Sequence, residues 1–417
     1  MKAPRHPLSS VGSALAGALL AILAAGSLAG CGAEREISSI EPVPSSREVN
    51  NPELGPPAVD PLSFGPGEKD SPSWSPSGER IAFIVDGYVS DKSLSSETTT
   101  RRTTRDLGAK RVTWPASGEE LVILGEGVPS GASNEDHDTH PLYVTRSGEG
   151  QLKIERLSEN ALAMSDPSGS EPLVAALESG PYESRISTVK AGERKLETYP
   201  NPLEGRVEEI SVSPDGSRAL VAAVAPGSGG SERYELHTFD LETGEGERVA
   251  RLGPGMEMFG SPQQTSSGIY YVAGEREGGR DLTQDSDIRY SLYHLPEGSA
   301  APKPASGVGQ DFLASSIKAS PDGASLALLG RRDSGSATNL YVLDLSDGSL
   351  DSATANENME IRTGVDSLDW RPDGESVAIV ARSDISGPRV YNGSASTLLA
   401  TFYNLYEVPV AELRESG

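Results

Sequence analysis

The residues best suited to chemistry form one short acidic run that contains two histidines, Glu135-Asp136-His137-Asp138-Thr139-His140. Imidazole nitrogens and carboxylate oxygens are common ligands of divalent metals in proteins. The candidate metal ligands are Asp136, His137, Asp138 and His140. Their spacing differs from that of two histidines one helical turn apart, and acidic runs are also typical of solvated loops. The sequence therefore predicts no bound cofactor, with a divalent cation at this run as the alternative.

Other residues that could do chemistry are sparse. A second acidic group, Asp281, Asp285 and Asp287, lacks the ligand spacing of an EF-hand calcium loop. His237 and His294 fall within expected strands, where packed side chains are the simpler interpretation. The sequence contains no phosphate-binding loop, dinucleotide fingerprint or C-x-x-C pair, and no G-x-S-x-G elbow follows its last repeat. We therefore expect no catalytic residues in this chain.

The chain is strongly acidic, with 61 Asp and Glu against 36 Lys and Arg, and a formal net charge of −25. A charge of this sign repels nucleic acid and anionic lipid headgroups. We therefore expect no nucleic-acid partner, and the acidity suits either a basic partner or simple solubility. Cys31 is the only cysteine, so no disulfide can form within the chain.

Residues 1–30 are typical of an export signal, with a basic start and an apolar stretch from Val11 to Gly26. Leu28-Ala29-Gly30-Cys31 then resembles a bacterial lipobox, which implies that Cys31 is acylated and becomes the mature N-terminus. A plain secretory signal and a membrane-spanning anchor are the alternatives. We expect a protein anchored through this lipid to the outer face of the cytoplasmic membrane or to the outer membrane, facing the periplasm or the cell exterior.

Two regions follow the signal. Residues 31–57 are rich in proline and serine and hold few apolar residues, so we expect a flexible tether. Residues 58–417 repeat one phrase, a proline–glycine turn before a short apolar run, as in Trp74-Ser75-Pro76-Ser77-Gly78. Proline fixes φ at the first corner of such a turn, and glycine accepts positive φ at the last. The predicted turn glycines are 78, 118, 169, 216, 268, 323 and 374. Their spacing of roughly 40 to 50 residues is typical of propeller blades.

A second phrase, a leucine within an apolar strand and usually followed by tyrosine, recurs after these turns. Its copies begin at Leu142, Leu236, Leu292, Leu340 and Leu405. Together the two phrases resemble the WD40-like (PD40) repeat of TolB-type propellers over about residues 58–412. The resemblance implies an all-β, seven-bladed β-propeller, counted as six full blades and one degenerate blade at about 70–105. It says little about function, because such propellers host many roles. TolB proteins carry a small α/β domain before the propeller, whereas a tether stands here, so no role in the Tol–Pal system is implied.

The repeat register also predicts how the ring closes and packs. The last blade has too few residues for its outermost strand, so we expect Val59 to Phe64 to pair with it and close the ring. Trp74, Trp114 and Trp370 share one position in the phrase, and we expect them to pack between blades.

Binding is expected on the rim opposite the turns. The connections between second and third strands are predicted to be long at Asp86–Glu97, Gly125–Pro141, Gly274–Tyr290 and Ser383–Leu398, and short at Glu178–Ser184. Long insertions on one face of a repeat ring often mark the binding face. The binding-face candidates are Glu126, Glu135, Asp136 and Asp138. Their acidity favours a basic ligand.

Taken together, these features predict a monomeric, membrane-anchored propeller that binds a protein, peptide or glycan of the cell envelope without catalysis. The alternative function is a metal-assisted glycan lyase or hydrolase on a TolB-like propeller. That alternative requires His137, His140, His237 and His294 to converge from three different blades.

Overall fold

The structure of the chain is a computed structural model, and the chain divides into two compact units, 1–40 and 41–417. The described residues, all in the second unit, are 60–63, 67–96, 98–103, 107–126, 139–146, 153–167, 171–227, 232–276, 288–299, 301–309, 311–333, 336–354, 359–364, 366–383, 402–411 and 413. The predicted signal, Cys31 and the tether lie outside them. Within these ranges no helical segment has the length and apolar character needed to cross a membrane.

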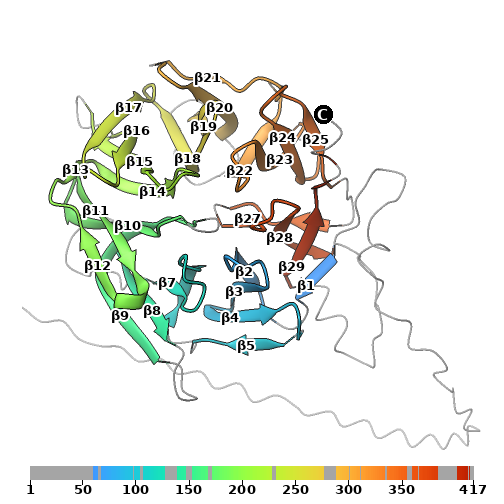
Figure 1. Ribbon diagram of the computed structural model, residues 1–417. Coiled ribbons are helices and arrows are strands. Elements are labelled where there is room, and N and C mark those ends of the chain that lie inside the picture. The colour runs from blue at the N-terminus through green and yellow to red at the C-terminus, as the bar shows by residue number, and fades with distance from the viewer. Residues whose placement is uncertain are drawn as a thin grey trace, which may run out of the picture. The chain divides into compact units, whose positions relative to one another are not determined.

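Hydrogen bonds join the described strands into six antiparallel sheets that follow one another round a common centre (Figure 1). The first sheet contains β2 (Lys69–Trp74), β3 (Arg80–Val85), β4 (Tyr88–Ser93) and β5 (Thr99–Arg101). The eight-stranded sheet contains β6 (Ala109–Thr113), β7 (Val122–Gly125), β8 (His140–Arg146), β9 (Lys153–Met164), β10 (Val174–Gly180), β11 (Glu183–Lys190), β12 (Lys195–Thr198) and β13 (Leu203–Glu204). A short 3-10 helix, η2 (Ala191–Glu193), links β11 to β12.

Three four-stranded sheets come next along the chain. The first contains β14 (Arg206–Val212), β15 (Arg218–Pro226), β16 (Glu232–Asp240) and β17 (Gly246–Arg251). The second contains β18 (Met256–Thr265), β19 (Gly268–Arg276), β20 (Ile288–Pro296) and β21 (Lys303–Pro304). The third contains β22 (Leu313–Ala319), β23 (Ser325–Arg331), β24 (Asn339–Asp344) and β25 (Leu350–Ser352).

The last sheet joins the two ends of the propeller. It contains β26 (Met359–Ile361), β27 (Leu368–Trp370), β28 (Ser376–Ser383), β29 (Asn404–Pro409) and, from the start of the chain, β1 (Asp60–Ser63). β1 pairs antiparallel with β29, with Asp60 opposite Glu407 and Pro61 opposite Tyr406. The predicted closure of the ring by an N-terminal strand is therefore confirmed.

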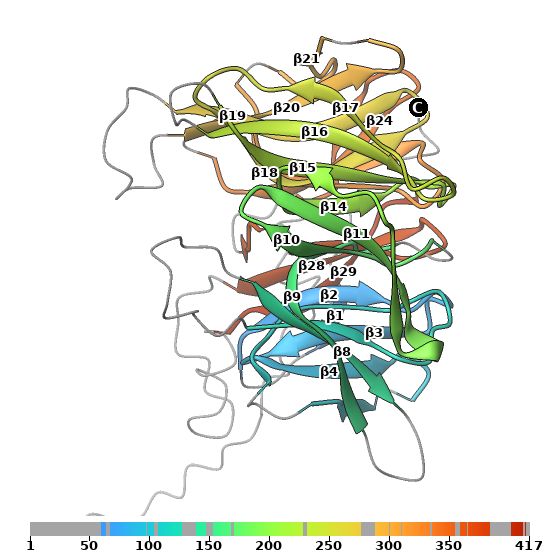
Figure 2. The same cartoon turned by 90° about the vertical axis from the view of Figure 1, so that its left-hand side faces the viewer.

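β9 explains why the strands form six sheets although seven blades were predicted. Its first half pairs with β8, with Lys153 opposite Arg146, and its second half pairs with β10, with Met164 opposite Ala175. Figure 2 shows β9 passing from the one set of strands to the other. The number of blades thus depends on whether the eight-stranded sheet is divided at β9. The first sheet, predicted to be degenerate, has four strands, although β5 is only three residues long and exposed.

The predicted turns form because their hydrogen bonds are local. In each of five turns the glycine N–H donates to the carbonyl three residues earlier, as Gly78 does to Ser75 at 2.8 Å. The glycine φ angles in these turns lie between 66° and 72°, which L-residues with a side chain rarely adopt. These glycines are 78, 118, 216, 323 and 374. Successive turns touch, since a Cβ at Gly118 would meet Pro76 and one at Gly78 would meet Arg371. They therefore line a common edge of the ring, the turn rim.

Two predicted details are wrong. Asp86–Glu97 is not a long connection, because only Asp86 and Gly87 separate β3 from β4. β4 was not predicted because its buried residues include two polar ones, Ser90 and Asp91. Asp91 can be buried because Arg80 and Arg102 neutralise its charge. In addition, the turn predicted at Gly268 lacks the proline of the phrase, because only Ser266 and Ser267 separate β18 from β19 and Pro262 lies within β18.

The apolar core lies between neighbouring sheets, as the tryptophans predicted. Trp114 packs with Ala82 and Ile84 of the first sheet, and Trp370 packs with Leu329 of the sheet before its own. Trp74 packs across the closure with Val380 and other residues of β28 and β29. All three are at most 3% exposed. Each lies between its own sheet and the preceding one, where a lone sheet would expose an apolar face to water.

Candidate functional site

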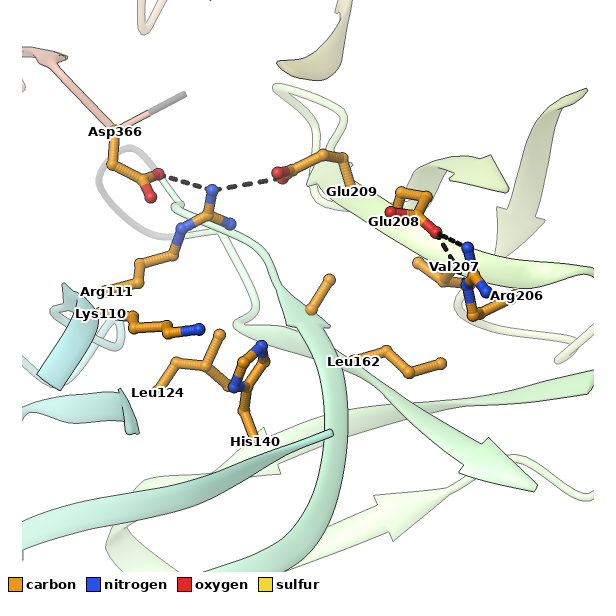
Figure 3. A pocket seen from close by; sticks show the side chains of 11 residues that line it. Lys110, Arg111, Leu124, His140, Leu162, Arg206, Val207, Glu208, Glu209 and Asp366 are labelled. Carbon is orange, nitrogen blue, oxygen red and sulfur yellow. Dashed lines mark hydrogen bonds and ion pairs between the residues drawn. The ribbon is translucent and has the colours of Figure 1, made fainter. Parts of the chain in front are cut away.

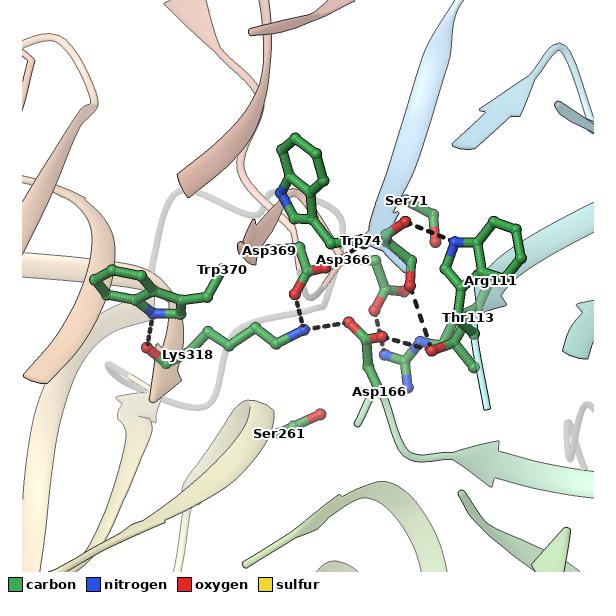
Figure 4. Close-up of polar contacts among 12 residues, drawn as sticks. Ser71, Trp74, Arg111, Thr113, Asp166, Ser261, Lys318, Asp366, Asp369 and Trp370 are labelled. Carbon is green, nitrogen blue, oxygen red and sulfur yellow. Dashed lines mark hydrogen bonds and ion pairs between the residues drawn. The ribbon is translucent and has the colours of Figure 1, made fainter. Parts of the chain in front are cut away.

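Polar side chains recur at alternate positions of the innermost strands, just before each turn. Alternate residues of a strand share one face, and here that face looks toward the axis of the ring. The pairs are Ser71 and Ser73, Arg111 and Thr113, Glu209 and Ser211, Ser261 and Gln263, Ser316 and Lys318, and Ser367 and Asp369. They bond across the axis to residues far away in the sequence (Figure 4). The axis is therefore polar and is filled by side chains.

The first group on the axis, the Lys318 cluster, consists of Lys318, Asp166 and Asp369. The Lys318 ammonium lies 2.5 Å from a carboxylate oxygen of each aspartate. Asp166 also accepts a hydrogen bond from the Thr113 hydroxyl at 2.8 Å, and Asp369 accepts one from the backbone N–H of Trp74 at 2.7 Å. Four sheets are tied together in this way.

Burial and charge act in opposite directions in this cluster. Desolvation raises the pKa of Asp369 to about 7; the attraction of Lys318 opposes that shift, and the neighbouring Asp166 adds to it. The pKa of Lys318 is raised above its ordinary value because the two aspartates outweigh its desolvation. Lys318 therefore stays charged at every physiological pH.

The second group, the Arg111 cluster, consists of Arg111, Glu209 and Asp366. The Arg111 guanidinium contacts Glu209 at 3.2 Å and Asp366 at 2.5 Å, and it donates to the Met164 carbonyl at 2.5 Å. Burial raises the pKa of the Glu209 carboxyl, and Arg111 opposes this shift. The Ser261 hydroxyl completes the group by donating to Glu209 at 3.0 Å.

A cavity of about 380 Å³ opens beside the Arg111 cluster (Figure 3). Its lining residues are Lys110, Arg111, Leu124, His140, Leu162, Ala163, Arg206, Val207, Glu208, Glu209 and Asp366. Leu124 is the last but one residue of β7, His140 begins β8, and Arg206 begins β14. These strand ends lie opposite the turn rim, on the edge that also carries the long predicted connections. The cavity therefore opens at one end of the axis, on the edge of the ring opposite the turn rim, which we call the loop rim.

The walls of the cavity combine apolar and charged surface. Leu124, Leu162, Ala163 and Val207 supply the apolar part. Arg206 is held by Glu208 at 2.7 Å, whereas Lys110 is exposed and extends toward the same space as the His140 ring in Figure 3. A mixed cavity of this size, in the range of about 300–1,000 Å³, suits a small molecule or one or two residues of a larger ligand.

The structure places only part of the predicted site. His140 is 9% exposed and lies in the cavity wall, and Glu126 is exposed just after β7. The remaining candidates, Glu135, Asp136, His137 and Asp138, lie outside the described residues, as do Asp281, Asp285 and Asp287. Of the connections that contain them, the ends are described: β7 ends at Gly125 and β8 begins at His140, and β19 ends at Arg276 and β20 begins at Ile288.

The other two histidines are packed, as expected. His237 lies 3.2 Å from Glu235 within β16, and burial lowers its pKa. His294 stacks on Tyr270 with ring centroids 4.3 Å apart and bonds the Ser267 carbonyl. Within the described ranges, no three His, Cys, Asp or Glu side chains are grouped so that they could hold one metal ion.

Sequence reasoning missed the two axial clusters. The signal was present, because a charged or hydroxyl residue stands directly before the tryptophan position in several repeats, as in Asp369-Trp370 and Lys318-Ala319. The sequence does not show which of these charged side chains contact one another, because Lys318 and Asp166 are 152 positions apart in the chain.

Comparison with known proteins identifies the fold. No protein-family model matches the chain, and no curated protein matches it. Among solved structures, an oligogalacturonate lyase from Vibrio parahaemolyticus matches at 12% identity, covering 85% of this chain and 94% of that one, with a TM-score of 0.53. The β-propeller domain of the Trilobed protease from Pyrococcus furiosus matches at 10% identity, covering 82% and 96%, with a TM-score of 0.50.

A putative TolB from Agrobacterium tumefaciens also matches, at 12% identity over 84% of this chain and 93% of that one, with a lower TM-score of 0.43. The matches therefore show that the chain has the β-propeller fold, as the repeat phrases predicted. At these identities they show nothing beyond the fold.

Proposed function

We propose that this chain is an exported binding module, which is anchored to the membrane through a lipid on Cys31 and captures a protein, peptide or glycan at the loop-rim cavity. One observation carries the proposal: the loop rim holds a cavity of about 380 Å³ whose walls are both apolar and charged. Apolar walls supply binding energy, and a few fixed polar groups supply orientation, which is the usual composition of a ligand site.

The axial clusters support a ligand that stays at this end of the axis. Arg111, Glu209 and Asp366 form the polar floor of the cavity, and the Lys318 cluster also occupies the axis. Most ionisable groups of the cavity are engaged in ion pairs, which suits recognition better than proton transfer. Lys110, which is exposed in the cavity wall, is the group best placed to meet a ligand.

A metal-assisted glycan lyase or hydrolase is the second candidate. It is favoured by His140, because an imidazole in a cavity wall can serve as a base or as a ligand. Of the four histidines that this function would bring together, His237 and His294 have other partners, and His137 lies outside the described residues. His140→Ala distinguishes the two candidates, because a lyase would lose turnover of acidic glycans while a binding module would keep most of its affinity.

The test of the binding function is capture from intact membranes by the full chain, followed by mass spectrometry of the retained proteins and glycans. A cavity variant that combines Lys110→Glu with Leu162→Gln should lose the captured ligand while keeping its circular dichroism spectrum. Lys303→Glu changes an exposed lysine of β21, outside the cavity lining, and serves as the matched control. A folded cavity variant that captures the same ligand as the wild type would place the site elsewhere.

The anchor is tested in the same cells by a Cys31→Ser variant. We expect this variant to appear in the soluble exported fraction, because the thiol that carries the lipid is missing. Unchanged membrane retention would contradict the lipid anchor.

A further inference from the structure

In three sheets, the tryptophan at one position of the repeat packs against the sheet before its own, whereas Val212 and Ala319 stand at this position in two others. The Trp114 indole packs on the first sheet, and its Nε1–H donates to the Ser73 carbonyl at 3.1 Å. Trp370 of the last sheet makes the same contact with the sheet of β22–β25, and its Nε1–H donates to the Lys318 carbonyl at 2.9 Å. A planar ring with an N–H donor is therefore the group that fills the space between two sheets near the turn rim.

An arginine covers the indole in two of these places. The Arg80 guanidinium carbon lies 4.8 Å from the centroid of the Trp114 ring, and that of Arg371 lies 5.6 Å from the Trp74 ring. Both distances are within the range of cation–π attraction. Arg80 is partly buried as a result of this stacking.

The sheet of β18 has a glutamine at this position. Gln264 directly precedes the turn residue Thr265 and pairs across the strands with Ile269, just as Trp74 precedes Ser75 and pairs with Ile81. No indole therefore reaches from this sheet toward the sheet of β14–β17, its neighbour in Figure 1.

A cavity of about 410 Å³ lies at this place. It is bounded on one side by Arg218 and Arg248 of the β14–β17 sheet, and on the other by Gln264, Ile269 and Leu295. The side-chain oxygen Oε1 of Gln264 is buried and has no hydrogen-bond partner among the described residues. An unsatisfied buried acceptor is unfavourable, so a ligand N–H that meets it after a rotation of the Gln264 side chain is stabilised.

The arginine cover is retained at this cavity. Arg218 stands five residues after Ser213, just as Arg80 stands five residues after Ser75. In each pair the backbone N–H of the arginine donates to the serine hydroxyl, at 3.0 Å for Arg218 and 3.1 Å for Arg80. The two arginines are therefore equivalent in the repeat. Arg80 covers an indole, whereas Arg218 is exposed and lines the cavity.

We infer that the cavity between the β14–β17 and β18–β21 sheets binds a planar aromatic ring with an N–H donor, such as the indole of a tryptophan side chain. The ring would lie between Ile269 and Leu295 and the guanidinium of Arg218, and its N–H would donate to Gln264 Oε1. The site is near the turn rim and is independent of the loop-rim cavity.

The test is calorimetric titration of the full chain with N-acetyltryptophanamide and with indole, using N-acetylleucinamide as the control ligand. We expect saturable binding of N-acetyltryptophanamide and none of the leucine compound. Binding of indole as well supports the inference and indicates a site for free aromatic compounds. Binding of the amide alone supports it and indicates a tryptophan that is carried by a peptide.

Three variants locate the binding. Gln264→Trp supplies the missing indole and should abolish binding of the probe. Arg218→Gln should weaken it roughly 2- to 30-fold, the span expected for a cation–π contact, while the matched Arg80→Gln should leave it unchanged. If Gln264→Trp does not fold, Gln264→Leu must weaken binding of the amide by removing the acceptor. No saturable binding to the wild type, or full binding to folded Gln264→Trp and Arg218→Gln, would overturn the inference.

Discussion

The two axial clusters have the same composition and different surroundings. Each contains one cation and two carboxylates that come from separate sheets. In the Lys318 cluster the side chains of Asp369 and Asp166 are 4% and 20% exposed, whereas in the Arg111 cluster those of Glu209 and Asp366 are 20% and 26% exposed. The clusters therefore differ mainly at Asp369, the one carboxylate that is almost fully buried. The difference arises because the Arg111 cluster borders the loop-rim cavity.

This difference assigns the clusters different roles. Asp369 has almost no access to water, so the Lys318 ammonium is required to compensate its charge. A cluster beside a cavity can exchange a protein partner for water or for a ligand. The planar guanidinium of Arg111 suits that place, because it reaches two carboxylates and a carbonyl at once.

The largest effect is expected from Lys318→Met. The change keeps the apolar stem and leaves Asp166 and Asp369 together without a cation, which should lower the free energy of unfolding by about 3–5 kcal/mol. Urea denaturation measures the loss. Adding Asp369→Asn to the same chain should recover part of it, because one buried carboxylate is then neutral. A loss below about 1 kcal/mol would mean that Asp369 is hydrated once the ammonium is gone.

Arg111→Met should cost less, about 1–3 kcal/mol, because Glu209 and Asp366 can be hydrated from the cavity. The same denaturation experiment compares it with Lys318→Met. The variant should also change ligand capture at the loop rim, which Lys318→Met should leave intact while folded. Equal losses of stability in the two variants would contradict the distinction between the buried Asp369 and the partly hydrated carboxylates beside the cavity.

The smallest effect is a change in the pH dependence of stability. Because the pKa of Asp369 is raised from 3.8 to about 7, the folded state holds a proton there that the unfolded state has released. This contribution to stability is fully present below pH 3.8 and is lost as the pH rises toward 7. Relative to Asp369→Asn, the wild type should therefore lose stability between about pH 4 and pH 7, as measured by thermal melting.

The control for this experiment is Glu375→Gln, which changes an exposed carboxyl on the turn rim. Its melting curves should run parallel to those of the wild type. Parallel curves for Asp369→Asn as well would show that Asp369 is ionised throughout this pH range.

The features predicted correctly are those that arise from local interactions. The turn at Pro372-Asp373-Gly374 forms because the Gly374 N–H donates to Arg371 at 2.9 Å and only glycine readily adopts its φ of 72°. The closing strand was predicted from a count of strands per repeat, and Trp114 and Trp370 from their common register. Each of these signals lies within a few residues or repeats at a fixed period.

The features predicted wrongly depend on partners that are distant or polar. β4 was mistaken for a loop because its buried Asp91 resembles loop composition until Arg80 and Arg102 are seen to neutralise it. The acidic binding face at Glu126 and its neighbours stays a prediction, and the cavity beside it carries three cations that the sequence did not point to, Lys110, Arg111 and Arg206. Those cations come from β6 and β14, which share no recognisable spacing in the chain.

The sequence by itself determined the propeller, the positions of its turns and the sheet-to-sheet packing of its tryptophans. A turn hydrogen bond and a repeated apolar strand need no information from outside the repeat. Only the tertiary structure decided which charges meet on the axis and where the ring leaves a cavity. Lys318 finds Asp166, and Gln264 faces Arg218 across a cavity, because closing the ring fixes distances between strands that the chain order leaves free.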